Sequence, residues 1–461
     1  MRLLSPEDWA AHQGRFVALW TDANHAYALY QPQELVAVAL DNGAYPALPH
    51  KGAAWFQRLA FDLHGHFDLH GHKAVGAADT RPAVEHHRAA DFTAPWPEFV
   101  SPGGEGVYQV AVGPVHAGII EPGHFRFSVR GEEVLRLEVR LGYAHKGTLG
   151  LMRGKSPRLA ARYAARVSGD ATVAHSLAFA QAAESALGVS APGRAVFLRG
   201  IMAELERLAN HTSDIGAIAG DAGFAFLDAR FALARETICA ASAAAFGHRL
   251  MMDIVVPGGV AGDLAEGGAE AILDALAALE AELPSLTRVF EDYASLQDRV
   301  IGTGIIPPAL AEAFHAGGYV GRASGQQQDA RVMPGYPPYQ SMALYVPVFQ
   351  EGDVAARIRV RLEEIPESIR LVRDMLAALP EGPLALALPP ESGMGLGVAE
   401  SFRGPVWHWL SIEGGAIAAA FIADASTLHW PLLEQAATTA ILADFPMINK
   451  SLNGSYSGVD L

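Results

Sequence analysis

The spacing of hydrophobic and polar positions divides this chain into two regions with different predicted architectures. In the first region, short apolar runs at 15–20 and 27–40 are followed by a helix-like segment at 51–63. This mixture predicts a small α+β domain. Clusters of Pro and Gly at 94–97 and 101–104 then interrupt regular structure, as expected at a domain boundary. We therefore divide the chain into a first domain at 1–93, a linker at 94–107 and a second domain at 108–461.

The second region begins with alternating apolar positions and then changes to a helical period. Residues 108–143 alternate around a turn at Gly131, which predicts a half-buried antiparallel pair of strands. Helical spacing follows in six segments, in chain order 156–186, 196–216, 225–252, 263–296, 308–316 and 355–379. The third segment would be about 40 Å long as one helix. Two apolar runs, 406–410 and 416–422, flank a Gly-Gly turn and predict a hairpin.

Together these patterns predict an α+β protein with a mainly α-helical bundle core and small antiparallel β-sheets, preceded by a small α+β domain. Half of the 461 residues are hydrophobic, so the chain can bury a large core. The 34 basic and 50 acidic residues give a formal net charge of −16. This balance argues against nucleic acid or anionic lipid as a direct partner, because both require a basic face.

The sequence also predicts where the protein is found and how it reaches a membrane. The N-terminus leads directly into polar residues without an apolar stretch, so we expect no signal peptide and a location in the cytoplasm. No segment approaches the roughly 20 uncharged apolar residues that span a bilayer. We therefore expect no transmembrane segment, and a peripheral position on the inner face of the cell membrane that depends on partner subunits.

A series of short motifs carries a family resemblance. In chain order they are 106–116, 121–126, 143–147, 204–211, 257–260, 321–325 with Asp329 and Arg331, and 402–405. As a set they resemble the large subunit of group 4 membrane-bound nickel-iron hydrogenases, of the formate hydrogenlyase and hydrogenase-4 types. They also resemble the homologous quinone-adjacent large subunit of respiratory complex I. In the first domain, 55–58, 62–65 and 79–82 resemble the 30-kilodalton-type partner subunit of complex I.

The metal-binding cysteines of the hydrogenases are missing. The resemblance implies two boxes with two cysteines each, the first at 168–171 and the second at 455–458, because thiolates are the soft ligands that hold nickel. The chain has one cysteine in total, and the four slots hold Ser168, Ala171, Ser455 and Gly458. Serine hydroxyls are poor nickel ligands, and alanine and glycine offer no side-chain donor. We expect no directly bound metal and no hydrogenase activity of the chain itself.

The complex I resemblance leaves a quinone site as an alternative. It implies a histidine on the first β-turn and a tyrosine beside the first box, which together can protonate a reduced quinone. His116 matches the histidine, but the tyrosine slot is Gly169, with Asp170 next to it and Tyr163 one helical stretch earlier. His175, retained after the first box, is either a packed histidine or a ligand.

Other polar residues have both a structural and a functional interpretation. Four residues of the later motifs are candidates for an ion network around the vacated cavity: Arg322, Asp329, Arg331 and Arg403. Glu204, Arg207 and His211 share one helix face, where they form either a buried ion pair or a path for protons.

Six histidines lie close together in the sequence of the first domain: His64, His66, His70, His72, His86 and His87. Their imidazoles could bind zinc or copper, but a loop of solvent-exposed histidines without a metal is the simpler interpretation.

We interpret the chain as a nickel-free large-subunit homologue. The resemblance implies a peripheral subunit of a membrane-bound complex I-like or hydrogenase-4-like oxidoreductase. It would dock on an iron-sulfur small subunit, which holds the cluster, and on membrane ion-translocating subunits, coupling electron transfer to ion movement. The alternatives are a quinone-reducing NADH-quinone oxidoreductase-type subunit, with quinone and NAD binding as the associated expectations, and a non-catalytic assembly scaffold.

Overall fold

The structure of the chain is a computed structural model. It describes residues 1–21, 24–40, 44–48, 50, 53, 56, 73–75, 99–116 and 120–461. The six clustered histidines, the first part of the linker and most of the helix expected at 51–63 lie outside the described residues.

The first domain is built on a four-stranded sheet in the order β1-β4-β3-β2. Its elements are β1 (Arg2–Leu3), α1 (Pro6–Ala11), β2 (Arg15–Thr21), β3 (His25–Gln31), β4 (Glu34–Ala39), β5 (Ala44–Pro46) and β6 (Lys73–Val75). The apolar run at 27–40 forms two antiparallel strands, because the polar turn at Pro32 and Gln33 interrupts it. Proline lacks the N–H that a central strand must donate.

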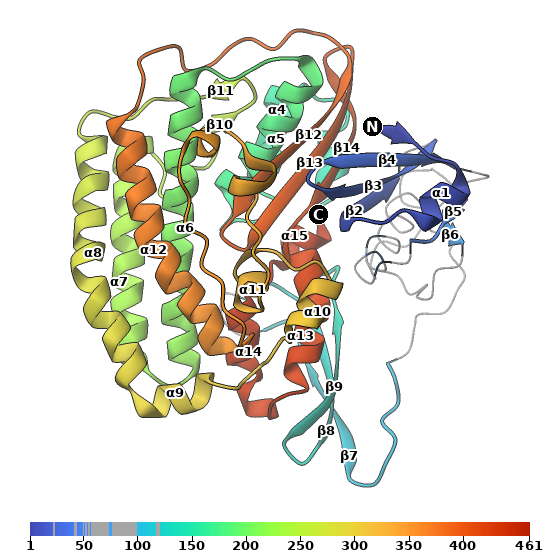
Figure 1. The fold of residues 1–461 in the computed structure, drawn as a ribbon, viewed down its shortest axis with the longest axis vertical. Coiled ribbons are helices and arrows are strands. Elements are labelled where there is room, and N and C mark those ends of the chain that lie inside the picture. The colour runs from blue at the N-terminus through green and yellow to red at the C-terminus, as the bar shows by residue number, and fades with distance from the viewer. Residues whose placement is uncertain are drawn as a thin grey trace.

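An aromatic cluster joins the first domain to the second. The Trp20 ring of β2 stacks on Phe421 with ring centroids 4.9 Å apart, and it lies 5.6 Å from both Tyr27 and Trp409. Phe421 and Trp409 belong to the second domain, and all four rings are buried. In Figure 1 the blue strands accordingly lie beside the orange-red sheet formed by strands β12 to β14.

The second domain contains two three-stranded antiparallel sheets and a small hairpin. The strands are β7 (Val107–Val112), β8 (His124–Arg130), β9 (Glu133–Arg140), β10 (Val255–Val256), β11 (Gly259–Val260), β12 (Gly393–Ser401), β13 (Gly404–Glu413) and β14 (Ala416–Ala423). The hairpin predicted around the Gly-Gly turn is confirmed as β13 and β14. The sheet predicted at 108–143 has three strands rather than two, because β7 and β9 both pair with β8.

Helices make up the rest of the second domain. They are α3 (Thr148–Met152), α4 (Pro157–Ala164), α5 (Thr172–Leu187), α6 (Gly193–Asp221), α7 (Ala225–Phe246), α8 (Gly268–Asp292), α9 (Ala294–Val300), α10 (Pro308–Ala313), α11 (Gly318–Ala323), α12 (Val354–Ala377), α13 (Ser426–Ala437), α14 (Phe445–Leu452) and α15 (Tyr456–Asp460). Short helical turns cover Arg331–Gly335, Tyr339–Ser341 and Leu442–Asp444. The predicted α+β class with a helical bundle core is confirmed.

Several predicted helices were too long, among them the segment at 263–296, which is divided into α8 and α9 at Tyr293. The segment at 156–186 is two helices, α4 and α5, because the first box forms an irregular connection between them. The segment at 225–252 ends at Phe246, where Gly247 adopts a left-handed φ of 78°, a common helix stop. As a result α7 is about 33 Å long rather than about 40 Å.

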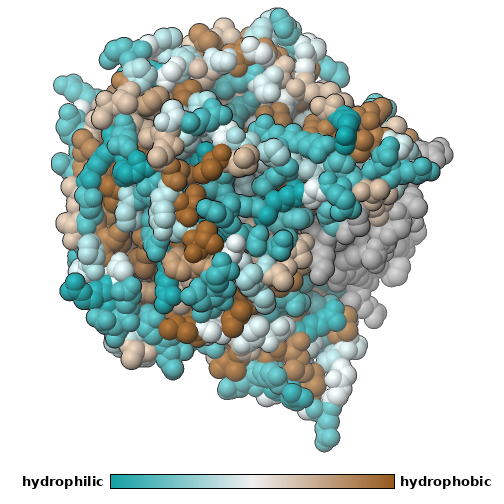
Figure 2. All heavy atoms as spheres, viewed as in Figure 1, coloured by the Kyte–Doolittle hydropathy of each residue, from teal (hydrophilic) through white to brown (hydrophobic). Residues whose placement is uncertain are grey.

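Helices α6, α7, α8 and α12 pack as a bundle, while α5 lies against β12 and β13 (Figure 1). Figure 2 shows hydrophilic residues over the face in view, with hydrophobic residues in separate patches between them. Within the described part of the chain, every helix is too short or too polar to cross a bilayer.

Close packing of α5 on β12 depends on a pattern of small residues. Gly393, Gly395 and Gly397 occupy every second position of β12, so they point to one face of the strand. A Cβ at these positions would lie 2.1, 2.0 and 2.0 Å from the carbonyl oxygens of Ala186, Ala182 and Ala178. These alanines recur every fourth residue of α5. The helix can therefore approach the strand only because neither surface carries a larger side chain.

We predict that Gly395→Ala lowers the free energy of unfolding by about 1–3 kcal/mol, because the added methyl group overpacks this contact. Urea unfolding followed by circular dichroism measures the change. Gly262→Ala is the matched control, since a Cβ there meets nothing within 4 Å. Equal stability of the two variants would contradict the close-packing account.

Candidate functional site

The two emptied boxes meet in the interior of the second domain. The first box connects α4 to α5, and the second opens α15 at Ser455. The Oγ atoms of Ser168 and Ser455 lie 2.8 Å apart although the residues are 287 positions apart in the chain. Ser168 Oγ also donates to Asp170 Oδ1 at 2.8 Å. Because the single Ser168 proton is used there, Ser455 is the donor between the two serines. Ser455 Oγ in turn accepts from the Gly458 N–H at 2.9 Å and caps α15.

Asp170 is held by a two-pronged ion pair with Arg403. The Arg403 guanidinium donates to both carboxylate oxygens of Asp170, at 2.8 and 2.5 Å. Its Nε also donates to the carbonyl oxygen of Asn453, beside the second box. Burial alone would raise the pKa of Asp170, but Arg403 and the Ser168 hydroxyl hold it below its usual range. Asp170 therefore remains ionised, and its side chain is still 40% exposed.

A carboxylate directly after β14 occupies the space beside the fourth cysteine slot. A Cβ on Gly458 would lie 2.6 Å from Asp424 Oδ2 and 2.8 Å from Ser455 Oγ. Asp424 accepts from the Ser426 N–H at 2.7 Å and from His175 Nε2 at 3.0 Å. Burial would raise the pKa of Asp424, but these donors, with Arg403, hold it well below its usual range.

Two histidines extend inward from Asp424. His175 Nδ1 lies 3.0 Å from His408 Nε2, and both rings are completely buried. Burial lowers the pKa of His408 far below its usual value, so this ring is neutral and donates from Nε2 to His175. The result is a dry Asp424–His175–His408 chain behind the second box.

These residues do not fit a nickel-iron centre. Two of the four slots carry hydroxyls that are already hydrogen-bonded, Ala171 and Gly458 offer no side-chain ligand, and Asp424 fills the space at the fourth slot. Across the described residues, no three or more His, Cys, Asp or Glu side chains are placed to hold a metal ion. The site therefore has hydrogen-bonding chemistry where the resemblance implied thiolate ligands.

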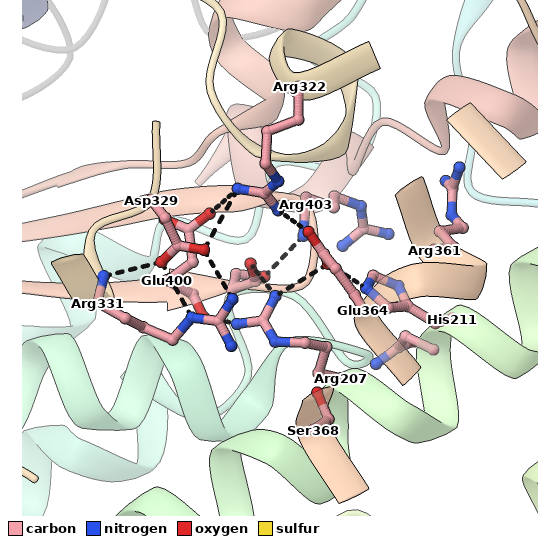
Figure 3. Close-up of polar contacts among 12 residues, drawn as sticks. Arg207, His211, Arg322, Asp329, Arg331, Arg361, Glu364, Ser368, Glu400 and Arg403 are labelled. Carbon is pink, nitrogen blue, oxygen red and sulfur yellow. Dashed lines mark hydrogen bonds and ion pairs between the residues drawn. The ribbon is translucent and has the colours of Figure 1, made fainter. Parts of the chain in front are cut away.

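A buried ion network lies next to the boxes, and its first half is centred on Arg322 (Figure 3). The Arg322 guanidinium lies 2.7 Å from Glu364 Oε1 and 3.0 Å from Glu400 Oε1. His211 Nε2 lies 2.6 Å from Glu364 Oε2. Burial would raise the pKa of Glu364, but Arg322 and His211 hold it well below its usual range. Burial and the nearby carboxylate of Asp329 raise the pKa of Glu400 to about 7.

The second half of the network is centred on Arg331. Its guanidinium contacts Asp329 at 2.6 Å and Glu204 at 3.0 Å. Glu204 also accepts from the Tyr339 hydroxyl at 2.6 Å and the Ser368 hydroxyl at 2.7 Å. These donors outweigh burial and lower the pKa of Glu204. A buried carboxylate with this many partners is fully compensated for the loss of water.

Asn453 connects this interior to the boxes. Its side-chain amide donates to Asp214 Oδ1 at 2.8 Å, while its carbonyl accepts from Arg403. Asp214 in turn pairs with Arg361 at 3.0 Å, and the Arg361 guanidinium lies 3.6 Å from the centre of the Tyr319 ring. A continuous polar path therefore runs from the half-exposed Asp170 into the helical bundle.

The structure separates the predicted site residues into three places. Arg322, Asp329 and Arg331 come together in the buried network, whereas Arg403 lies with Asp170 at the first box. Glu204, Arg207 and His211 join the same network through ion pairs. These contacts are buried ion pairs, and the alternative of a proton path stays a prediction.

The two candidates for a quinone site lie apart from the network. His116, between β7 and β8, has its Nε2 2.9 Å from the carbonyl oxygen of Gly123. Gly123 packs against Tyr456, since a Cβ there would lie 2.3 Å from that ring. His116 is thus near the second box. Tyr163 lies on α4. The Nζ atom of Lys155 is 5.5 Å from the centre of its ring.

Sequence analysis missed several residues of the site: Glu206, Glu364, Glu400, His408 and Asp424. A signal for one of them was present, because α12 carries Arg357, Arg361, Glu364 and Ser368 at helical spacing on its buried face. The others are single polar residues within apolar elements. Glu206 accepts from the N–H groups of Val173 and Ala174 at the start of α5, and burial raises its pKa to about 8.

Comparisons with known proteins identify relatives of this chain. Residues 225–392 match the family described as respiratory-chain NADH dehydrogenase, 49 Kd subunit. The chain is 29% identical over 357 residues to formate hydrogenlyase subunit 5 of Escherichia coli, covering 76% of this chain and 62% of that one. It is 31% identical over 284 residues to NADH-quinone oxidoreductase subunit 4 of Thermus thermophilus, covering 60% of this chain and 68% of that one.

A solved structure shares the fold. A chain from the membrane-bound sulfane sulfur reductase, an archaeal respiratory membrane complex, superposes with a TM-score of 0.73 at 22% identity. The match covers 78% of this chain and 100% of that one. The helical bundle and its small sheets are therefore an architecture found in subunits of such complexes.

We predict that Gly458→Cys destabilises the protein, because the new Cβ collides with the Asp424 carboxylate. Asp424→Ala removes this obstacle, so the double variant should lose about 0.5–3 kcal/mol less stability than the sum of the single variants. A double-mutant cycle by urea unfolding measures this coupling. Gly169→Cys is the control, since a Cβ there meets nothing within 4 Å. Strict additivity would show that Asp424 does not occupy the slot.

We also predict that two buried histidines reduce the stability of the fold as the pH drops below about 6.5, a contribution opposite in sign to that of the buried carboxyls of Glu206 and Glu400. Burial lowers the pKa of His211 and of His429 from 6.5 to about 4. The unfolded chain therefore binds protons first as the pH falls. Each histidine contributes a slope of up to about 1.4 kcal/mol per pH unit between these values.

Unfolding by urea at several pH values between 7 and 4.5 tests this expectation. His429→Gln should reduce the slope by roughly one proton, because it removes one buried titrating ring. His248→Gln, at an exposed histidine, should leave the slope unchanged. Identical slopes for the wild type and His429→Gln would contradict the prediction.

Proposed function

The chain belongs to the family of the 49-kDa subunit of respiratory-chain NADH dehydrogenase and the related large subunits of group 4 membrane-bound hydrogenases, and from this we propose its role. It lacks the metal-binding cysteines of those hydrogenases. It works as a peripheral, nickel-free subunit of a membrane-bound oxidoreductase complex. Formate hydrogenlyase subunit 5 and NADH-quinone oxidoreductase subunit 4, two of its relatives, are named as subunits of larger enzymes. Its partners on this proposal are an iron-sulfur small subunit and membrane ion-translocating subunits, on the cytoplasmic side of the membrane.

The observation that carries the proposal is the chemistry of the two boxes. The fold that positions the boxes is retained. Their four slots hold two serine hydroxyls, an alanine methyl group and a glycine, and Asp424 lies where the fourth ligand would enter. Hydrogen chemistry at a thiolate-bound nickel therefore has no ligands here. What the interior retains is a set of paired charges that leads from Asp170 into the bundle, which suits proton and conformational coupling rather than metal catalysis.

Purification of the native complex through this chain tests the proposal. We expect membrane proteins and an iron-sulfur protein to co-purify in fixed ratio, with iron present and nickel far below one atom per chain by plasma mass spectrometry. One nickel per chain would overturn it, as would a chain that purifies from its native cells without stoichiometric partners.

A quinone site is the second candidate, and the position of His116 favours it. This histidine is partly buried, bonds to Gly123 and lies close to Tyr456 of the second box. His116→Leu should weaken the binding of ubiquinone-1 to the native complex at least tenfold, measured by calorimetry. His248→Leu, at an exposed site, should leave it unchanged. Equal binding by both variants would favour a scaffold without a quinone site at His116.

A further inference from the structure

Basic residues are concentrated in one stretch of this acidic chain. Residues 139–169 contain seven Lys and Arg residues and no Asp or Glu, although the whole chain has 34 basic and 50 acidic residues. The stretch covers α3, α4 and the connections around them. A local excess of positive charge on a protein with a net charge of −16 needs a reason outside its own electrostatics.

Four of these cations have no ion-pair partner among the described residues, although Asp253, the partner of Arg166, also acts electrostatically on Arg162. They are Arg153, Lys155, Arg158 and Arg162, and none of them makes an ion pair within the part of the chain that the structure describes. By contrast, Arg166 is paired with Asp253 at 2.7 Å. Three of the four are exposed and Lys155 is half-buried. Two exposed leucines, Leu151 and Leu159, lie among them, so the surface combines charge with apolar contact area.

A cleft opens beside these cations. It has a volume of about 610 Å³ and is lined by the start of α4 at 156–158, by Leu187 and Pro257, by residues 385–390 and by the turn at 414–415. Most of this lining is aliphatic or proline, and Arg158 provides the cationic side chain. A smaller hollow of about 220 Å³ lies next to it and shares Arg158, with Arg162 and Asp253 on its wall. Arg158 therefore faces both hollows.

One wall of this cleft is an extended segment whose outer edge makes no backbone hydrogen bond to another described residue. Leu386 N–H donates to Gly258 and Val260 N–H donates to Leu384, so residues 384–386 add to the β10–β11 hairpin. In an antiparallel ladder the N–H and C=O groups of alternate residues point to opposite sides. The backbone of Ala385, which lies between the two bonds, therefore points away from the hairpin. Such an edge pairs readily with an extended segment from another chain.

We propose that this cleft binds an extended acidic segment of a partner protein. The backbone of that segment pairs with the free edge at 385–387, its aliphatic side chains enter the cleft beside Leu187 and Leu386, and its carboxylates face Arg158 and Arg162. This proposal rests on the proposed function, because it requires a partner subunit. The chemistry of the cleft selects the partner: acidic, extended and partly aliphatic.

A protein segment fits this surface better than an anionic membrane does. The site is a cleft, whereas a bilayer offers a flat surface that reaches only convex or planar patches. Glu391 and Glu413 border the segments that line the cleft, and their charge would oppose the approach of a lipid surface. A single chain with spaced carboxylates can contact the arginines while its remaining side chains avoid these two residues.

The first test uses the full chain and a fluorescein-labelled peptide of five Glu-Leu repeats. Fluorescence anisotropy should show saturable binding that weakens with added NaCl. Arg158→Glu combined with Arg162→Glu should weaken binding at least tenfold. Arg153→Glu with Lys155→Glu, both outside the helices, provides a second variant should the first fail to fold, with a smaller expected loss. Arg288→Glu, at an exposed arginine of α8, is the matched control and should bind normally.

Three results would overturn the proposal. One is equal peptide binding by the wild type and both charge-reversal pairs. Another is equal binding of a Lys-Leu peptide, which would show that charge is not recognised. The third is binding to phosphatidylglycerol vesicles that depends on Arg158 and Arg162 while the peptide does not bind, which would assign the surface to a membrane.

The second test separates this proposal from the proposed function. A photoreactive benzoylphenylalanine replaces the exposed Leu386 in the native complex, and mass spectrometry identifies the crosslinked peptide. We expect a segment of a co-purifying subunit that is rich in Asp and Glu. A complex that assembles normally but crosslinks only within this chain would overturn the cleft proposal and leave the proposed function intact. Failure of any partner to co-purify would instead overturn the proposed function.

Discussion

The structure depends most on the mutual compensation of buried charges in the helical bundle. Arg322 and Arg331 are almost fully buried together with their carboxylate partners Glu364, Glu400 and Glu204. Moving any one of these groups out of water is costly unless it is paired and hydrogen-bonded. The pairs join α6, α11, α12 and β12, so the elements must meet in one arrangement for any charge to be satisfied. Removing a single partner from such a set typically costs about 3–5 kcal/mol.

The same compensation explains how the emptied boxes remain ordered. In a metal-bound relative the boxes would be held by ligand bonds, whereas here hydrogen bonds join them. Ser455 donates to Ser168, Ser168 donates to Asp170, and Arg403 closes the set through Asp170 and Asn453. The interior has therefore replaced one kind of crosslink between the two ends of the domain with another. This replacement preserves the fold but not the capacity to hold nickel.

Several parts of the structure were predictable because they follow from local spacing. The hairpin of β13 and β14 was predicted from two apolar runs around Gly414 and Gly415, and most helices from a 3.6-residue period. The predictions failed where tertiary contacts override the local pattern. The first box splits the segment at 156–186, because its backbone and side chains bond to residues of α6 and to the second box rather than continuing a helix. The strand β12 was missed because its glycines lack strand propensity, and they make sense only against the alanines of α5.

For the candidate site, the sequence alone determined which chemistry was absent. Four slot residues without thiolates, recognised through the resemblance, exclude a thiolate-bound nickel centre wherever those residues lie. The sequence motifs also made Arg322, Asp329, Arg331 and Arg403 candidates for an ion network. Only the tertiary structure decided which carboxylates complete that network, that Arg403 serves Asp170 instead, and that Asp424 fills the fourth slot. The physical reason is that pairing energies depend on distance and burial, and residues as far apart as Asp170 and Arg403 acquire both only when the chain is folded.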